Sequence, residues 1–96
     1  MTKQEVVSVI SKKTGIDKVT AMTAVEAFME TVKEAMANEG KNVYLRGFGS
    51  FILKKRAQKT ARNITLNTTL TIPEHFIPAF KPAKEFASAV KDNSDL

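Results

Sequence analysis

Few residues of this 96-residue chain have the chemistry of a catalytic or metal site. The sequence has one histidine, His75, and no cysteine, so it lacks both a thiolate and ligand partners at a recognised metal-site spacing. Glu74 beside His75 has the composition of an acid–base pair, but neighbouring residues of a strand point to opposite faces. Gly47-x-Gly49 is too short for a dinucleotide fingerprint and precedes a strand rather than a helix. We therefore expect no enzyme activity, no cofactor and no bound metal.

The chemistry that the sequence does offer is a dense run of positive charge. Residues 54–64 (KKRAQKTARNI) carry five basic side chains and no acid, and the run ends on an isoleucine. If the run is extended, one face carries Lys54, Arg56, Gln58, Thr60 and Arg62. This polar and basic face suits contact with a phosphate backbone. The ordinary alternative is a charged strand edge that prevents aggregation, but it leaves the length of the run and its uncharged, Thr-rich opposite strand unexplained.

Positive charge is concentrated in the second half of the chain. Residues 41–84 hold nine basic residues against one acid, a net charge of +8, whereas residues 1–40 sum to −1 and residues 85–96 to −2. Such clustering indicates a polyanionic partner, either nucleic acid or an anionic membrane surface. The sequence has no basic amphipathic helix with a free apolar face, no long apolar span and no secretory signal. We therefore expect a cytoplasmic protein without membrane contact.

Helices are predicted at both ends of the chain. Thr2 and Glu5 form a capping-box pattern before a helix over residues 3–14, and Gly15 is a typical stop. Asp17 can cap a second helix of about twenty residues, whose apolar side chains recur with the helical period. Pro82 is expected in the first turn of a last short helix that ends near residue 90.

Between these helices the sequence predicts strands. The β-rich runs 42–46 and 50–53 flank a Gly-Phe-Gly turn and read as a hairpin. The second run continues through Arg62 without Gly or Pro, and alternating residues 65–72 give a returning strand. The fold class is thus α+β, with one domain over residues 1–96. Its parts are a helical base (1–40), a sheet and arm (41–84, with a ribbon at about 55–76), and a C-terminal helix and tail (85–96).

A ribbon without a buried face is marginal in water, and the remaining body of about 74 residues is near the size at which one core barely suffices. Both difficulties ease if two chains share one core. We therefore predict an obligate dimer, with a shared core that includes Phe28, Val32, Phe48, Phe51 and Phe80.

Four motifs resemble those of the bacterial HU/IHF family of histone-like DNA-binding proteins. They are residues 12–15 (KKTG), 46–51 (RGFGSF), 61–63 (ARN) and 77–82 (IPAFKP). The resemblance covers nearly the whole chain and is closest to HU. It implies an intertwined dimer with a saddle-like antiparallel sheet and two β-ribbon arms that lie in the minor groove. Where the family typically has a proline wedge after Arg-Asn at the arm tip, this chain has Ile64, an apolar side chain that can also part a base step.

The function that the resemblance implies is binding of double-stranded DNA with little sequence specificity, so that a homodimer bends and compacts the bacterial chromosome in the nucleoid. Charge and resemblance together predict contacts to phosphates or the groove by Lys3, Arg46, Lys54, Lys55, Arg56, Gln58, Lys59, Thr60, Arg62, Asn63, Lys81 and Lys84. Lys3 rests on the resemblance alone. Two alternatives stay open: a site-selective IHF-like subunit, which could pair with a paralogue as a heterodimer, and a charge-driven binder of RNA or anionic surfaces.

Overall fold

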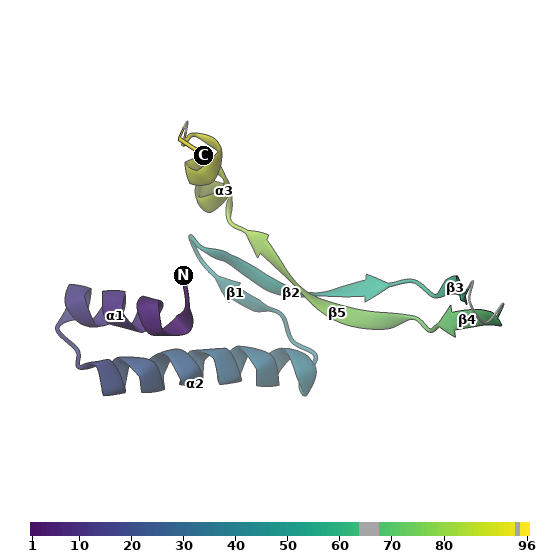
Figure 1. The fold of residues 1–96 in the computed structure, drawn as a ribbon, viewed down its shortest axis with the longest axis horizontal. Helices are drawn as coiled ribbons and strands as arrows, with labels where there is room; N and C mark the ends of the chain where they lie inside the picture. The colour runs from purple at the N-terminus through teal and green to yellow at the C-terminus, as the bar shows by residue number, and fades with distance from the viewer. Residues whose placement is uncertain (64–67, 94) are drawn as a thin grey trace.

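Two helices form the base of the chain (Figure 1). The computed structural model describes residues 1–63, 68–93 and 95–96. Helix α1 (Lys3–Thr14) begins where Thr2 Oγ1 accepts a hydrogen bond of 3.3 Å from the Glu5 N–H, and α2 (Lys18–Ala37) begins with the corresponding bond from the Thr20 N–H to Asp17. These local signals confirm both predicted helices. The helices pack around Val7 and Ala21, which are each 2% exposed.

An antiparallel sheet follows, in the order β1-β2-β5, with β1 (Val43–Leu45), β2 (Gly49–Arg56) and β5 (His75–Pro82). The predicted hairpin is confirmed, and its turn depends on glycine. Gly47 has a φ of 83°, which favours glycine over other residues. At Gly49 an added Cβ would lie 2.5 Å from Phe80 Cζ and 2.6 Å from the Lys81 carbonyl oxygen, so β2 and β5 can approach closely only without a side chain there.

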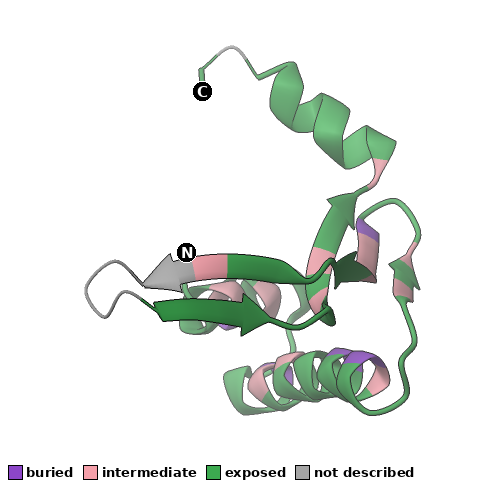
Figure 2. Cartoon of the chain, turned by 90° about the vertical axis from the view of Figure 1, so that its right-hand side faces the viewer, coloured by how far each residue is buried: buried purple, intermediate pink, exposed green. Residues whose placement is uncertain are grey.

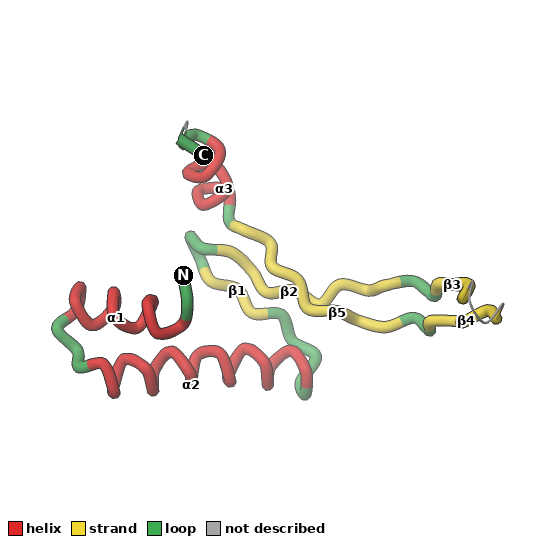
Figure 3. Tube along the Cα trace, in the orientation of Figure 1, coloured by secondary structure: helices red, strands yellow, loops and turns green. Residues whose placement is uncertain are grey.

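The arm is a two-stranded ribbon that extends from the sheet away from the helices (Figure 3). It is formed by β3 (Lys59–Asn63) and β4 (Thr68–Ile72). The prediction of one unbroken run from Lys54 to Arg62 is wrong, because the strand is interrupted at residues 57–58. The interruption lies opposite Pro73, which has no N–H to donate across the ladder. Arg56 pairs with His75 and Lys59 with Ile72, so both strands advance by three residues and none is inserted.

Helix α3 (Lys84–Lys91) follows β5 directly. The prediction that Pro82 lies in its first turn is wrong, since Pro82 is the last residue of β5 and pairs with Gly49. The helix begins after Ala83, whose N–H donates to the Phe48 carbonyl at 2.9 Å. The rings of Phe48 and Phe86 stack with centroids 5.4 Å apart, and this contact attaches α3 to the hairpin turn.

The chain has little interior of its own (Figure 2). Among the described residues, the buried apolar side chains are Val7, Ala21, Val32 and Met36. The radius of gyration is 18.9 Å, whereas a compact chain of this length has one of about 12.5 Å. The accessible surface is 8106 Å², against roughly 5,500 Å² for a globular monomer of this mass. The arm accounts for part of this excess, and exposed apolar surface near α2 for another part.

Candidate nucleic-acid interface

The register of the sheet separates two chemically different faces. Directly opposed residues of antiparallel strands lie on the same face, and alternate residues on opposite faces. Phe51 pairs with Phe80 and Leu53 with Pro78. These four residues and Phe76 form what we call the helix-side face. The name reflects the groove between this face and α2, which all of them except Phe80 line.

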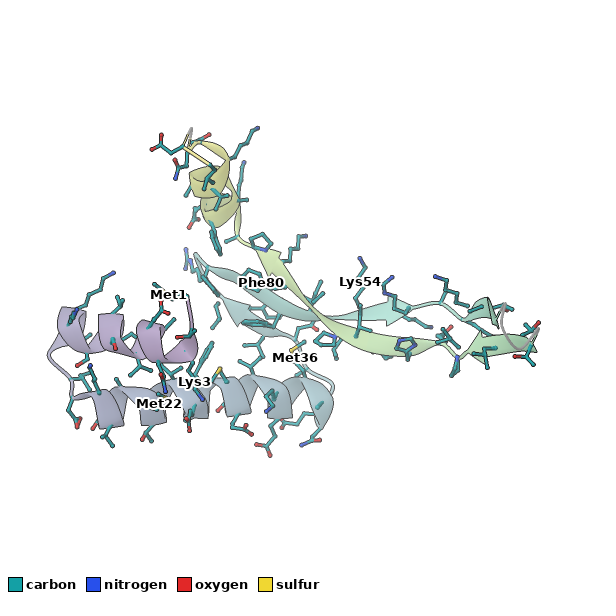
Figure 4. All side chains as sticks on the ribbon, in the orientation of Figure 1. Met1, Lys3, Met22, Met36, Lys54 and Phe80 are labelled. Atoms are coloured by element: carbon teal, nitrogen blue, oxygen red, sulfur yellow. The ribbon has the colours of Figure 1, made fainter. Side chains whose placement is uncertain are left out.

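The opposite face carries Lys54, Arg56 and Lys81, and we call it the basic face. Its rows pair Ser50 with Lys81, Ile52 with Ala79, Lys54 with Ile77, and Arg56 with His75, with Tyr44 beside Ser50 on β1. In Figure 4, Lys54 projects to the side of the sheet away from α2, whereas Met36 lies between α2 and the sheet. The sequence alternation that predicted a shared face for Lys54 and Arg56 is therefore confirmed.

Ion pairing leaves the basic face uncompensated. Within the described residues, the ion pairs of the chain involve Lys3, Lys33, Lys41 and Lys55, and none involves Lys54, Arg56 or Lys81. Lys55 lies on the other side of β2 and pairs with Glu74 at 2.8 Å. The charges of the basic face are thus free to meet an external polyanion, whereas Lys55 already has a carboxylate partner.

A hollow of about 430 Å³ extends the basic face toward the hairpin turn and the start of α3. Its lining brings together three of the predicted contacts from three segments: Arg46, Lys81 and Lys84. Tyr44 and Ser50 add two hydroxyl groups to the same lining. Convergent ammonium, guanidinium and hydroxyl donors are suited to phosphate oxygens.

The remaining predicted contacts are distributed along the arm and the helical base. Thr60 lies opposite Thr71, which gives the ribbon a pair of hydroxyls on one face, and Lys59 lies on the other face opposite Ile72. Gln58 lies in the interruption between β2 and β3, and Lys3 pairs with Glu26 at 3.3 Å on the helical base. Arg62 and Asn63 belong to β3, but their side chains, like the whole of Ile64, lie outside what the structure describes.

The predicted dimer-core residues surround an open apolar groove and an aromatic cluster. The groove has a volume of about 1080 Å³ between α2 and the helix-side face, and Phe28, Val32 and Phe51 line it. Phe48 and Phe80 contact each other with ring centroids 5.1 Å apart. Val32 is buried within the chain, whereas Phe28 is 44% and Phe48 47% exposed, so their place in a core shared by two chains stays a prediction.

Sequence reasoning missed three side chains of the basic face: Tyr44, Ser50 and His75. Tyr44 is held in place because Asn42 Nδ2 donates to its hydroxyl at 3.1 Å, while Asn42 Oδ1 accepts from the Leu53 N–H at 2.9 Å. Alternation within β2 carried no information about residues on β1 and β5. The missing signal was the register between strands, which depends on contacts between distant parts of the chain.

No group of three or more acidic or histidine side chains that could hold a metal ion occurs in the described part of the chain. Over the same residues, no helix is both long and apolar enough to cross a membrane.

Comparison with known proteins identifies the family. The sequence profile of the family described as bacterial DNA-binding protein matches residues 1–91. The chain belongs to the bacterial DNA-binding protein family. Within this family it is 38% identical over 94 residues to integration host factor subunit beta of Marinobacter nauticus, across 97% of this chain and 95% of that protein. It is 37% identical over 91 residues to the DNA-binding protein HU of Thermotoga maritima, across 95% of this chain and 100% of HU. The predicted HU/IHF resemblance is thus confirmed.

The fold of this family member also matches a solved structure. The structure titled Anabaena HU-DNA cocrystal superposes with a TM-score of 0.89 at 35% identity, covering 96% of this chain and 99% of that one. The match includes the arm, since it covers nearly the full length of both chains. The predicted α+β fold of the chain, with two N-terminal helices, an extended β-ribbon and a C-terminal helix, is confirmed.

Proposed function

We propose that this member of the bacterial DNA-binding protein family acts as a homodimer that binds double-stranded DNA with little sequence specificity, bends it and compacts the chromosome in the cytoplasm. The observation that carries the proposal is the separation of the sheet into a basic face and an apolar helix-side face. The helix-side face borders an apolar groove, and none of the ion pairs among the described residues involves Lys54, Arg56 or Lys81 on the basic face.

Dimerisation is supported by the surface that the single chain leaves exposed. The chain exposes roughly 2,600 Å² more than a compact monomer of its mass. The arm accounts for part of this excess, and the exposed apolar surface near α2 could contribute to the roughly 2,000–5,000 Å² that stable homodimers bury in total. Phe28 and Phe51 line a groove that lies along α2, so a second copy in this groove would remove both rings from water. The free energy gained by burying these apolar side chains would offset the small core of each chain.

DNA binding and bending follow from the same geometry. Cations on the basic face would neutralise phosphates on one side of the duplex and release condensed counterions. The arm would follow the minor groove, where base pairs present few distinguishing groups, so sequence preference would be low. Insertion of Ile64 at the arm tip would part a base step, and the cost of unstacking would be offset by the longer contact with the bent DNA. The likeness to a protein crystallised with DNA supports this arrangement.

The first test is a fluorescence-anisotropy titration of several unrelated duplexes and one RNA duplex over a range of salt. If each dimer neutralises about eight phosphates, log K should fall with log salt at a slope of roughly −7. Similar affinities on unrelated DNA duplexes would support the proposal. Strong preference for one sequence would favour the site-selective IHF-like alternative. Equal affinities for RNA and DNA would favour charge-driven binding. An affinity that does not depend on salt would refute the electrostatic interface.

A further inference from the structure

His75, the single histidine of the chain, lies at the root of the arm, on the basic face. It is the first residue of β5, it is exposed, and it lies directly opposite Arg56 on β2. Lys54 is the next charged residue on the same face, two positions along β2. The imidazole therefore occupies the same surface as the cations that we propose to contact DNA.

A hydrogen bond fixes which nitrogen of His75 is available. Nδ1 lies 2.9 Å from the carbonyl oxygen of Pro73. Because a carbonyl oxygen only accepts hydrogen bonds, this contact requires the proton on Nδ1. The remaining nitrogen, Nε2, is then the position that gains or loses a proton, and histidine is the side chain whose charge ordinarily changes between about pH 5 and pH 8.

Among the residues that the structure describes, the surroundings of His75 provide no partner for a positive charge. From β2, Arg56 and Lys54 face it, and both are cations. Toward the arm, Gln58 lies within the interruption and Thr71 lies beyond it on β4, and both side chains are neutral. The neighbouring acid, Glu74, is bound to Lys55 on the opposite side of the ribbon. A phosphate that approaches the basic face would therefore supply the partner that an imidazolium at this position does not find among the described residues.

The geometry points to His75 as a further phosphate ligand, which binds the DNA backbone through Nε2–H in its doubly protonated form. Binding of DNA would then take up a proton at the root of each arm, up to two per dimer. This inference rests on the proposed function, because the phosphate that stabilises the imidazolium belongs to the bound duplex. It adds a proton-linked contact to the salt-linked contacts of Lys54 and Arg56.

The test is a set of salt titrations of duplex binding at about pH 5.5 and pH 8, on the wild-type protein and on His75→Gln and His75→Lys. With two imidazolium contacts per dimer, the wild-type salt slope should be steeper by about 1.8 at the lower pH, so the ratio of the two affinities should grow about tenfold between 200 mM and 50 mM salt. His75→Gln should keep the shallow slope at both pH values, and His75→Lys the steep one. The three proteins differ at position 75 alone, so the difference between them isolates His75.

Calorimetry gives an independent measurement of proton uptake. The heat of DNA binding near pH 7, measured in buffers of different ionisation enthalpy, should show proton uptake by the wild-type protein and none by His75→Gln. Salt-dependent binding with identical pH profiles for the two proteins would overturn the role of His75 and leave the proposed function intact. Absence of DNA binding at every pH would overturn both.

Discussion

Adjacent residues of one strand provide a sharp test of the assignment of faces. Lys55 and Arg56 follow each other on β2 and carry the same charge, but they lie on opposite faces, and Lys55 is paired with Glu74. We predict that Arg56→Gln weakens DNA binding much more than Lys55→Gln. The net charge of the protein falls equally in both variants, so a general effect of charge cancels in the comparison.

The magnitude follows from the number of phosphates that each variant leaves without a partner. Each dimer has two copies of Arg56, and each neutralised phosphate contributes about 0.9 to the salt slope, so Arg56→Gln should reduce the slope by about 1.8. Its affinity deficit should therefore be about tenfold larger at 50 mM than at 200 mM salt. Lys55→Gln should leave the slope nearly unchanged. Because Glu74 loses its partner in this variant and would repel DNA, the measured difference in affinity between the two variants is a lower bound.

The assay is an anisotropy titration of one duplex with the wild-type protein and both variants at four salt concentrations. Circular dichroism provides the folding control, because the Lys55–Glu74 pair is more than half exposed and should contribute at most about 1 kcal/mol to stability. Equal reductions of slope in the two variants would refute the reasoning. That result would mean that DNA contacts both faces of β2, or that only the total charge matters.

Three further predictions concern the arm tip, the groove and the hairpin turn. Ile64→Ala should reduce DNA bending, seen as end-to-end energy transfer, more than it reduces affinity; equal loss of both would remove the wedge role. Phe28→Asp should convert the dimer to a monomer in light scattering, since Phe28 lines the groove and is 44% exposed. Glu30→Gln, on the same helix, is the control and should keep the dimer mass; a dimer mass retained by Phe28→Asp would contradict the interface. Gly49→Ala should lower the free energy of unfolding in urea by about 1–3 kcal/mol, because the new Cβ meets the Lys81 carbonyl at 2.6 Å; an unchanged unfolding midpoint would show that β5 can move aside.

Elements with local causes were predictable from the sequence. The bounds of α1 agree with the prediction because Thr2 at one end and Gly15 at the other are specified within a few residues of the chain. Asp17 does the same for the start of α2. The hairpin was also predictable, because its glycines and the flanking β-rich runs lie within about a dozen residues.

Features that depend on pairing between distant segments were not predictable. The interruption at residues 57–58 originates in Pro73 on the opposing strand, and Pro82 was assigned to a helix because its partner, Gly49, is thirty-three residues away. The same holds for the interface. Strand alternation found Lys54 and Arg56, whereas the place of His75 opposite Arg56 could be known only from the register. Phe48 is 47% exposed in the single chain, and its place in a core shared by two chains stays a prediction.

The central claim is that the dimer bends DNA through its basic face and arms, and energy transfer across an end-labelled duplex tests it most directly. Titration with the protein at low salt should bring the two ends closer on several unrelated sequences, and the ends should separate again as salt is raised. Binding without any change in the end-to-end distance would contradict the account, because it would leave the protein as a clamp on straight DNA.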